Sequence, residues 1–434
     1  MIRSLISFAM VIVLLAATFI SPVETHARRC GEKEPETLLS LYKRSSFIFV
    51  ATFDRTEDGG LVEQGDDYSV RRELSYFTVS RALKGETRKS FVLEEKEYRY
   101  SGEETSDGDG ENEVSEDTPV AGPSDHEEDG ELYGRPKLKQ DDTVILFLRK
   151  ASEGEQLELV DYRDAIRKAK DEDLATYEKR INELNVIFNA AGDKDKAVVE
   201  WLISLIDDPL TRWDGAYELL LGFYQLDWIK EEESRQAIEG KNETEGSAEE
   251  EYEVDELERA EMEISSDRLR YARLVTENHK QGLLNLLVEE LANAERGEDG
   301  KHSSLNEGND ALLGLVKRWG DKRLAGHLLD RLAAGVGENY EKYQLMDNIA
   351  SILKNEELTS LAEQFGNHLY MDDNATVEDD DENAEPEANS GDESEKIEQN
   401  RDEPSAKLPT YGEVRAEALA KFIHAANLLL TTEA

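Results

Sequence analysis

The stretch SFIFVATF at residues 46–53 alternates aromatic and β-branched side chains with smaller ones. Alternation with a period of two residues is typical of a β-strand. Four later stretches carry a similar pattern, at residues 74–80 (LSYFTVS), 91–95 (FVLEE), 143–149 (TVILFLR) and 157–161 (LELVD). No helical pattern separates these strands, so the sequence predicts a small, closed, OB-like antiparallel β-barrel rather than a parallel sheet. We also expect a short helix before the first strand, with Leu38, Leu39 and Tyr42 on one side.

The motifs of this part follow a definite order. Cys30 is followed by SSFIFVATF, then by FTVSRALKGE, then by DDTVILFLRK. This order resembles the netrin/tissue-inhibitor-of-metalloproteinase (NTR, or TIMP-like) type of OB-fold domain in bacterial secreted proteins, and the resemblance implies that fold for residues 28–162. The inhibitors of that family grip a catalytic zinc with an N-terminal Cys-x-Cys. Here Arg28 and Arg29 precede Cys30, and Glu32 stands in place of the second cysteine. The resemblance therefore implies the fold without the inhibitory mechanism. Cys30 is the only cysteine, so it is either an incidental thiol or a link to another chain.

Residues 1–27 have the pattern of a secretory signal peptide. Arg3 supplies the positive charge, residues 5–20 form the apolar run, and Thr25 and Ala27 are the small residues that predict cleavage after Ala27. The alternative is a membrane anchor, but the run is short for a span. We expect a secreted, periplasmic or cell-envelope protein with no membrane span after cleavage.

After Tyr162 the apolar residues recur at helical spacing, and the sequence predicts an α-helical domain over residues 163–434. The expected helices lie at 174–189, 193–206, 212–229, 265–275, 277–294, 308–319, 321–334, 340–354, 356–370 and 411–430. The stretch NDALLGLVKRWGDKRLAGHLLDRLAAG from Asn309 resembles HEAT-type repeats, which stack to bury their apolar stripes. A non-repetitive helical bundle is the alternative. The predicted fold class is therefore α+β and multidomain.

The formal net charge of -47 is concentrated in three segments. Residues 101–132, 231–263 and 372–406 hold 13, 15 and 15 acidic residues against 0, 3 and 2 basic ones, and the remaining 334 residues hold 55 against 46. Such composition cannot bury a core, so we expect three disordered acidic insertions between elements of a nearly neutral body. Asp107 and Asp109 begin a pattern like a calcium loop, but Asn112 and Thr118 occupy positions that need Gly and Glu. A solvated acidic loop is the expectation there.

Motifs that carry chemistry are missing from the sequence. It contains no P-loop, no G-x-G-x-x-G, no G-x-S-x-G, and no H-E-x-x-H or C-x-x-C pair. We therefore assign no catalytic, cofactor-binding or metal-binding residue. His327 and His424 lie within apolar helical patterns, which predicts packed or partly exposed helix positions. The four tryptophans, Trp201, Trp213, Trp228 and Trp319, lie at helical spacing among leucines and isoleucines, which favours core positions over a ligand groove.

The OB-like barrel and the HEAT-like helical domain are scaffolds that usually present interaction surfaces, and catalytic motifs are missing. We therefore predict a non-enzymatic protein-binding module with an extracytoplasmic protein partner. One alternative is a hydrolase whose site is assembled from scattered carboxylates. Another is an acidic envelope protein that binds calcium or other cations with low affinity. We expect no nucleic-acid partner, because single-strand binding needs a cationic groove and a chain this acidic repels phosphate. The sequence leaves the oligomeric state open.

Overall fold

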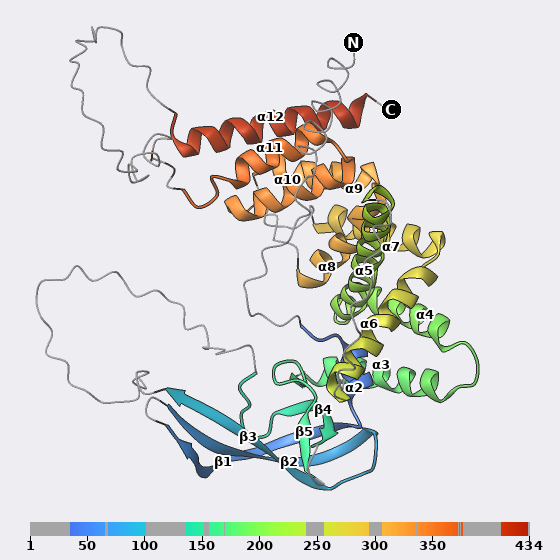
Figure 1. Cartoon of the computed structure of the whole chain (residues 1–434), viewed down its shortest axis with the longest axis vertical. Helices are drawn as coiled ribbons and strands as arrows, with labels where there is room; N and C mark the ends of the chain where they lie inside the picture. The colour runs from blue at the N-terminus through green and yellow to red at the C-terminus, as the bar shows by residue number, and fades with distance from the viewer. Residues whose placement is uncertain are drawn as a thin grey trace, which may run out of the picture.

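The computed structural model describes residues 35–65, 68–100, 136–151, 156–168, 170–239, 256–294, 306–335, 337–371, 373, 375 and 409–432. The predicted signal peptide, Cys30 and the acidic segment 101–132 lie outside these ranges, as does nearly all of segment 372–406. The described chain has a β-rich N-terminal part and a helical C-terminal part, which lie at opposite ends of the molecule in Figure 1.

The β-rich part is one antiparallel sheet that curls into a nearly closed barrel. Its strands are β1 (Phe47–Gln64), β2 (Tyr68–Lys84), β3 (Ser90–Tyr100), β4 (Thr143–Lys150), β5 (Leu157–Leu159) and β6 (Ile166–Lys168). The strand order is β3-β2-β1-β4-β5, and β6 also pairs with β4. All five expected strands are present. The first two are much longer than predicted, and β6 lies beyond residue 162, where we expected the β-rich part to end.

The first half of strand β1 is buried on both faces, which explains the alternation seen in its sequence. Phe47, Phe49, Ala51 and Phe53 point into the barrel, where Phe49 lies 5.6 Å from Phe91 between ring centroids. The intervening Ile48 and Val50 join a second core that includes the helices. Strand β4 divides its side chains in the same way. The two central strands therefore connect the barrel interior to the helical part.

Helix α2 (Leu38–Arg44) precedes β1 and packs against β4, α5 (Arg212–Glu239) and α6 (Glu256–Leu274). The remaining described helices are α3 (Asp171–Asn189), α4 (Lys194–Ile206), α7 (Glu277–Ala294), α8 (Glu307–Val316), α9 (Lys322–Ala333), α10 (Asn339–Leu353), α11 (Glu356–Gly366) and α12 (Tyr411–Thr431), with the short 3-10 helix η2 (Lys317–Trp319). Asp193 caps α4, as the sequence predicts. Helices α9, α10, α11 and α12 each contact the next one along the chain, and α12 also contacts α9. The last four described helices therefore pack as a four-helix group.

The second acidic segment is only partly an insertion between elements. We expected residues 231–263 to be disordered, but residues 231–239 form the C-terminal turns of α5 and residues 256–263 form the first turns of α6. Glutamate has good helix propensity, so an acidic stretch can extend a helix that is already nucleated by its apolar half. The prediction of disorder was wrong for these two stretches. Residues 240–255 lie outside the described ranges.

Candidate functional site

The barrel has a seam between β3 and β5, the two end strands of the sheet. These strands contact each other, but among the described residues no backbone pairing joins them. One side-chain hydrogen bond crosses the seam, where the Gln156 amide donates to a Glu94 carboxylate oxygen at 3.3 Å. One edge of β3 thus has no partner strand within the described part of the chain.

The register of β3 identifies which backbone groups face this seam. The Val79 N–H donates to the Lys89 carbonyl at 2.9 Å, and the β2–β3 register continues from there without a shift. Hydrogen-bonded pairs alternate in an antiparallel ladder, so every second residue from Lys89 onward bonds to β2. The intervening residues direct their N–H and C=O groups to the free edge. They include Val92, Glu94 and Lys96.

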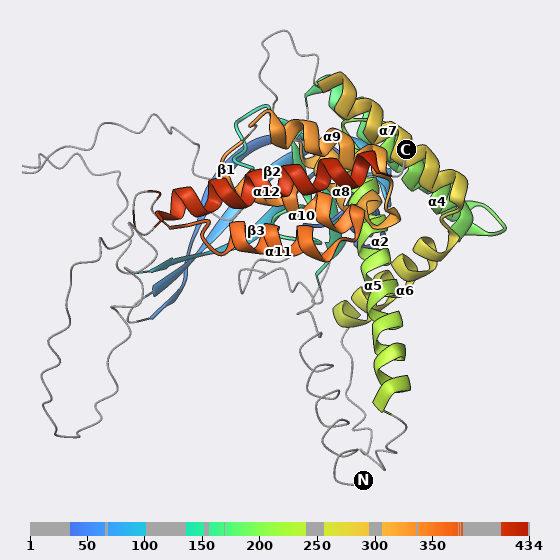
Figure 2. The same ribbon diagram turned by 90° about the horizontal axis from the view of Figure 1, so that it is seen from above.

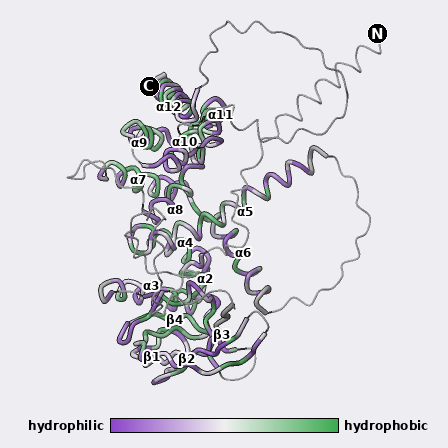
Figure 3. Tube along the Cα trace, turned by 90° about the vertical axis from the view of Figure 1, so that its left-hand side faces the viewer, coloured by the Kyte–Doolittle hydropathy of each residue, from purple (hydrophilic) through white to green (hydrophobic). Residues whose placement is uncertain are grey.

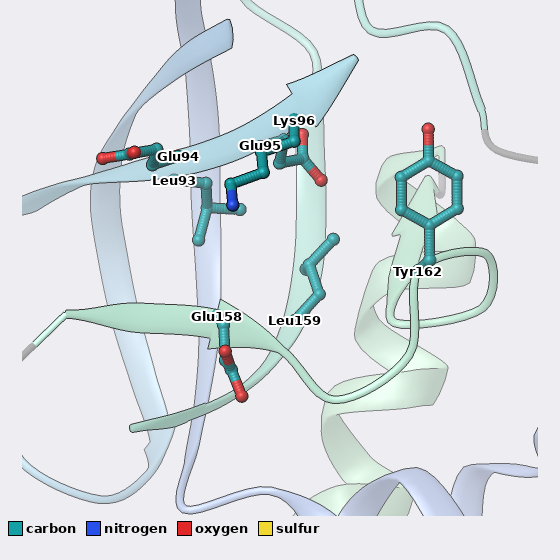
Figure 4. Close-up of a pocket in the computed structure, with 7 residues that line it drawn as sticks. All are labelled: Leu93, Glu94, Glu95, Lys96, Glu158, Leu159 and Tyr162. Carbon is teal, nitrogen blue, oxygen red and sulfur yellow. The ribbon is translucent and has the colours of Figure 1, made fainter. Parts of the chain in front are cut away.

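A pocket of about 210 Å³ lies in the seam (Figure 4). Its lining residues come from β3, from β5 and from the turn after β5: Leu93, Glu94, Glu95, Lys96, Glu158, Leu159 and Tyr162. Leu93 is buried, and Leu159 packs partly against the core, so the pocket has an apolar floor. The Tyr162 side chain is 58% exposed and stands on the opposite side of the pocket from Glu94.

Two of the pocket's carboxylates already have arginine partners. Glu94 lies 2.8 Å from the Arg72 guanidinium, and Glu158 lies 2.7 Å from that of Arg149. These pairs leave little net charge at the rim to attract an ionic ligand. Each of these two carboxylates is thus engaged by an arginine, whereas the hydrolase alternative requires an acid–base couple. The pocket is better suited to an apolar side chain, with a neighbouring backbone paired to the edge of β3.

A second group of charged side chains is buried at the junction of the barrel and the helices. Asp214 and Glu218, one turn apart on α5, are each 2% exposed. Asp214 accepts from the Leu38 N–H at 2.7 Å and lies 3.2 Å from Arg167, while Glu218 accepts from Arg268 at 3.0 Å. Burial raises the pKa of the Asp214 carboxyl, against the effect of Arg167. A substrate has no access to side chains buried to this degree, so the group holds the fold together.

The residues that the sequence singled out do not gather at one place. Trp201 is buried in α4, whereas Trp213 and Trp319 are half-buried against aromatic neighbours. The core prediction is wrong for Trp228, which is 63% exposed. His327 is half-buried and His424 exposed, in keeping with packed or partly exposed helix positions. Within the described ranges, no group of three or more His, Cys, Asp or Glu side chains is placed to hold a metal ion.

Sequence reasoning missed the seam pocket, because its residues are individually ordinary. Only the curvature of the sheet brings Leu93 beside Leu159 and Tyr162, and no local pattern encodes that approach. Comparison with family models, with curated proteins and with solved structures finds no match for this chain. None of the helices in the described ranges combines the length and apolar composition of a membrane-spanning segment.

Proposed function

We propose that this chain is a non-enzymatic protein-binding module of the secreted or cell-envelope compartment, and that it binds an extended segment of a partner protein at the β3–β5 seam. The observation that carries the proposal is the edge of β3 that no described strand pairs with, beside a pocket with an apolar floor. Strand addition to such an edge supplies main-chain hydrogen bonds, and a pocket beside it supplies selectivity for one side chain.

An OB-like assignment of the barrel, with the NTR-type resemblance, belongs to this proposal. The sheet begins as a β1–β2–β3 meander, returns with β4 against β1, and adds β5 on β4. This connectivity supports the assignment, because the OB fold is a five-stranded, partly open Greek-key barrel. For the helical part, the contact between α12 and α9 supports a bundle rather than a HEAT-like solenoid for its last four described helices. If α8–α9 and α10–α11 were successive repeats, α12 would lie beyond the repeat next to α9, and a solenoid repeat touches only its neighbours.

The proposed segment lies extended along β3, with its backbone against the edge groups of Val92, Glu94 and Lys96, and it displaces β5 from its present contact with β3. One large apolar side chain enters the pocket between Leu159 and Tyr162. The compartment follows from the signal-peptide pattern at residues 1–27, which supports export of the chain.

The test uses the full chain and peptides of about 12 residues selected on it from a random display library. Lys96→Pro removes one edge N–H while leaving the β2 ladder intact, since proline is tolerated on edge strands. Lys96→Ala is the matched control, because it changes the side chain and keeps the N–H. We expect the selected peptides to bind the Lys96→Ala chain and to lose binding to the Lys96→Pro and Tyr162→Ala chains. Selection of no peptide, or binding that survives both of these changes, would refute the proposal.

A further inference from the structure

Helix α5 carries an exposed pair of aromatic side chains. Trp228 is 63% exposed and Tyr224 is 43% exposed. The two residues are four apart in a helix, so their side chains lie next to each other on one face. Large aromatic side chains rarely face solvent together without a use, because burying them against a partner is strongly favourable.

An arginine fixes one side of this aromatic pair. The Arg318 guanidinium of η2 lies 5.1 Å from the centre of the Tyr224 ring and 5.3 Å from that of Phe223. It also bonds to the Asp227 carboxylate at 2.7 Å. Tyr224 is therefore held in place before any partner arrives, which reduces the entropy lost on binding. Trp, Tyr and Arg are the residue types that most often dominate binding energy at interfaces.

The opposite side of α5 is packed, so the exposed face is presented on a firm support. On that side Gly222 lies directly against the backbone of Arg268 in α6, and on the flank of the helix Gln225 donates to the Ser265 hydroxyl at 2.7 Å. Beyond this contact, the C-terminal turns of α5 extend away from the rest of the helical part (Figures 2 and 3). The Trp228 side chain, which is 63% exposed, is thus open to a partner.

Acidic side chains follow the aromatic pair along α5. Glu231 lies three residues after Trp228, and Glu231 and Glu233 are both exposed. The nearby bases Lys230 and Arg235 are already paired, with Asp227 and Glu232 respectively. The rim of the surface therefore carries a negative charge that a cationic partner would neutralise.

We infer that the Tyr224–Trp228 face is a second docking surface, for a partner segment that places a large apolar side chain between lysines or arginines. The charge of the rim selects this chemistry. It disfavours the chain's own residues 240–255, which hold seven acidic residues and one lysine, and it disfavours a second copy of the same face. The inference is independent of the seam, which lies in the barrel and accepts an uncharged side chain.

The probe is a labelled peptide of about 12 residues in which one Trp and one Leu lie between paired lysines, titrated into the full chain at low salt. An acidic version with Glu for Lys and a version with Ser for Trp and Leu test charge and apolar content. We expect saturable binding of the basic peptide alone, weakened by salt. Trp228→Ala should raise its Kd about tenfold or more, as for interface anchors.

Tyr340→Ala is the matched control, because Tyr340 is a 52% exposed aromatic residue on a different helix, and it should leave the Kd unchanged. Thermal unfolding of both variants checks the fold, which neither exposed side chain supports. Equal binding of the acidic and basic peptides, an unchanged Kd in Trp228→Ala, or no saturable binding up to about 1 mM peptide would each overturn the inference. Loss of binding in Lys96→Pro as well would place the peptide in the seam and overturn it too.

Discussion

The guanidinium of Arg167 in β6 lies 3.2 Å from the carboxylate of Asp214 in α5. Arg167 also donates to the Glu36 carbonyl at 3.0 Å, just before α2. One side chain thus joins the last described strand of the barrel, the segment that leads into α2 and the longest described helix. The barrel and the helices are held together by a buried ion pair as well as by apolar packing.

Removing the Asp214 carboxylate should lower the free energy of unfolding substantially. Asp214→Ala leaves Arg167 without its charge partner and the Leu38 N–H without its acceptor, in a site that is 2% exposed at Asp214. Breaking a buried pair from one side typically costs about 3–5 kcal/mol. We expect a matching loss in the free energy of unfolding, measured by urea denaturation. Glu57→Ala, which breaks an exposed pair with Arg55, should leave the urea midpoint unchanged. Equal effects of the two changes would contradict the structural role of Asp214.

Replacing glycine with alanine should have opposite effects on stability at two helical positions, Gly222 and Gly282. A Cβ at Gly222 would overlap the Arg268 carbonyl oxygen, so Gly222→Ala should push α5 from α6 and cost about 1–3 kcal/mol. A Cβ at Gly282 in α7 would meet nothing within 4 Å. Gly282→Ala should therefore stabilise the protein by roughly 0.5–1 kcal/mol through helix propensity. Thermal and urea unfolding measure both, and a stabilising Gly222→Ala would mean that the two helices are not in this contact.

Lys84 should lose its proton at an unusually low pH for a lysine. Its ammonium group donates to the Tyr42 carbonyl at 2.7 Å and lies 4.0 Å from the centre of the Tyr42 ring. Burial lowers the pKa of Lys84 from 10.5 to about 8. NMR of ¹³C-methylated lysines should show one resonance with a midpoint near pH 8, missing in Lys84→Met. A midpoint near 10.5 for the resonance of Lys84 would show that its ammonium group is solvated.

The same shift has a consequence for stability. Between pH 8 and 10.5 the unfolded chain holds a proton on Lys84 that the folded chain has released. Stability attributable to Lys84 therefore rises with pH across this window, and its desolvation cost is fully present below it. Relative to the wild type, Lys84→Met should be most favourable at neutral pH and should lose that advantage by pH 10.5. Urea denaturation at several pH values measures the difference.

The acidic segments offer a test of where the folded body ends. Replacing residues 101–132, 240–255 and 376–406 with uncharged Gly/Ser linkers of equal length should keep the thermal midpoint or raise it, because self-repulsion falls. Extending the second replacement to residues 231–263 should lower the midpoint, because it removes the last turns of α5 and the first turns of α6. Unfolding of the first variant would show that these segments are structural.

Much of the fold is predictable because its signal is local. The alternation at residues 46–53 predicts β1, and the structure explains it by burial on both faces. The apolar spacing of residues 277–294 predicts α7 with the bounds that the structure has. Asp193 caps α4 through its own side chain, a contact that spans three residues and is visible in sequence.

The features that escaped prediction depend on contacts between distant residues. Strand β6 has three residues, which are too few to show the alternation of a strand in sequence. It forms because its backbone pairs with β4. Trp228 has the spacing of a core residue, yet α5 continues past the helices that would cover it. The seam pocket arises because β3 and β5 approach without pairing, and strand periodicity contains no information on that distance.

Helix α2 meets its helical partners, α5 and α6, late in synthesis, after its strand partner β4 has been made. Lys43 donates to the Tyr271 hydroxyl at 2.9 Å across 228 residues of sequence. At a synthesis rate of about 5–20 residues per second, that separation corresponds to roughly 11–46 seconds. Until α5 and α6 have been made, Leu38, Leu39 and Leu41 lack the helical surface against which α2 packs. A chaperone that recognises apolar segments thus has many seconds to bind the N-terminal region of the nascent chain before α6 arrives to displace it.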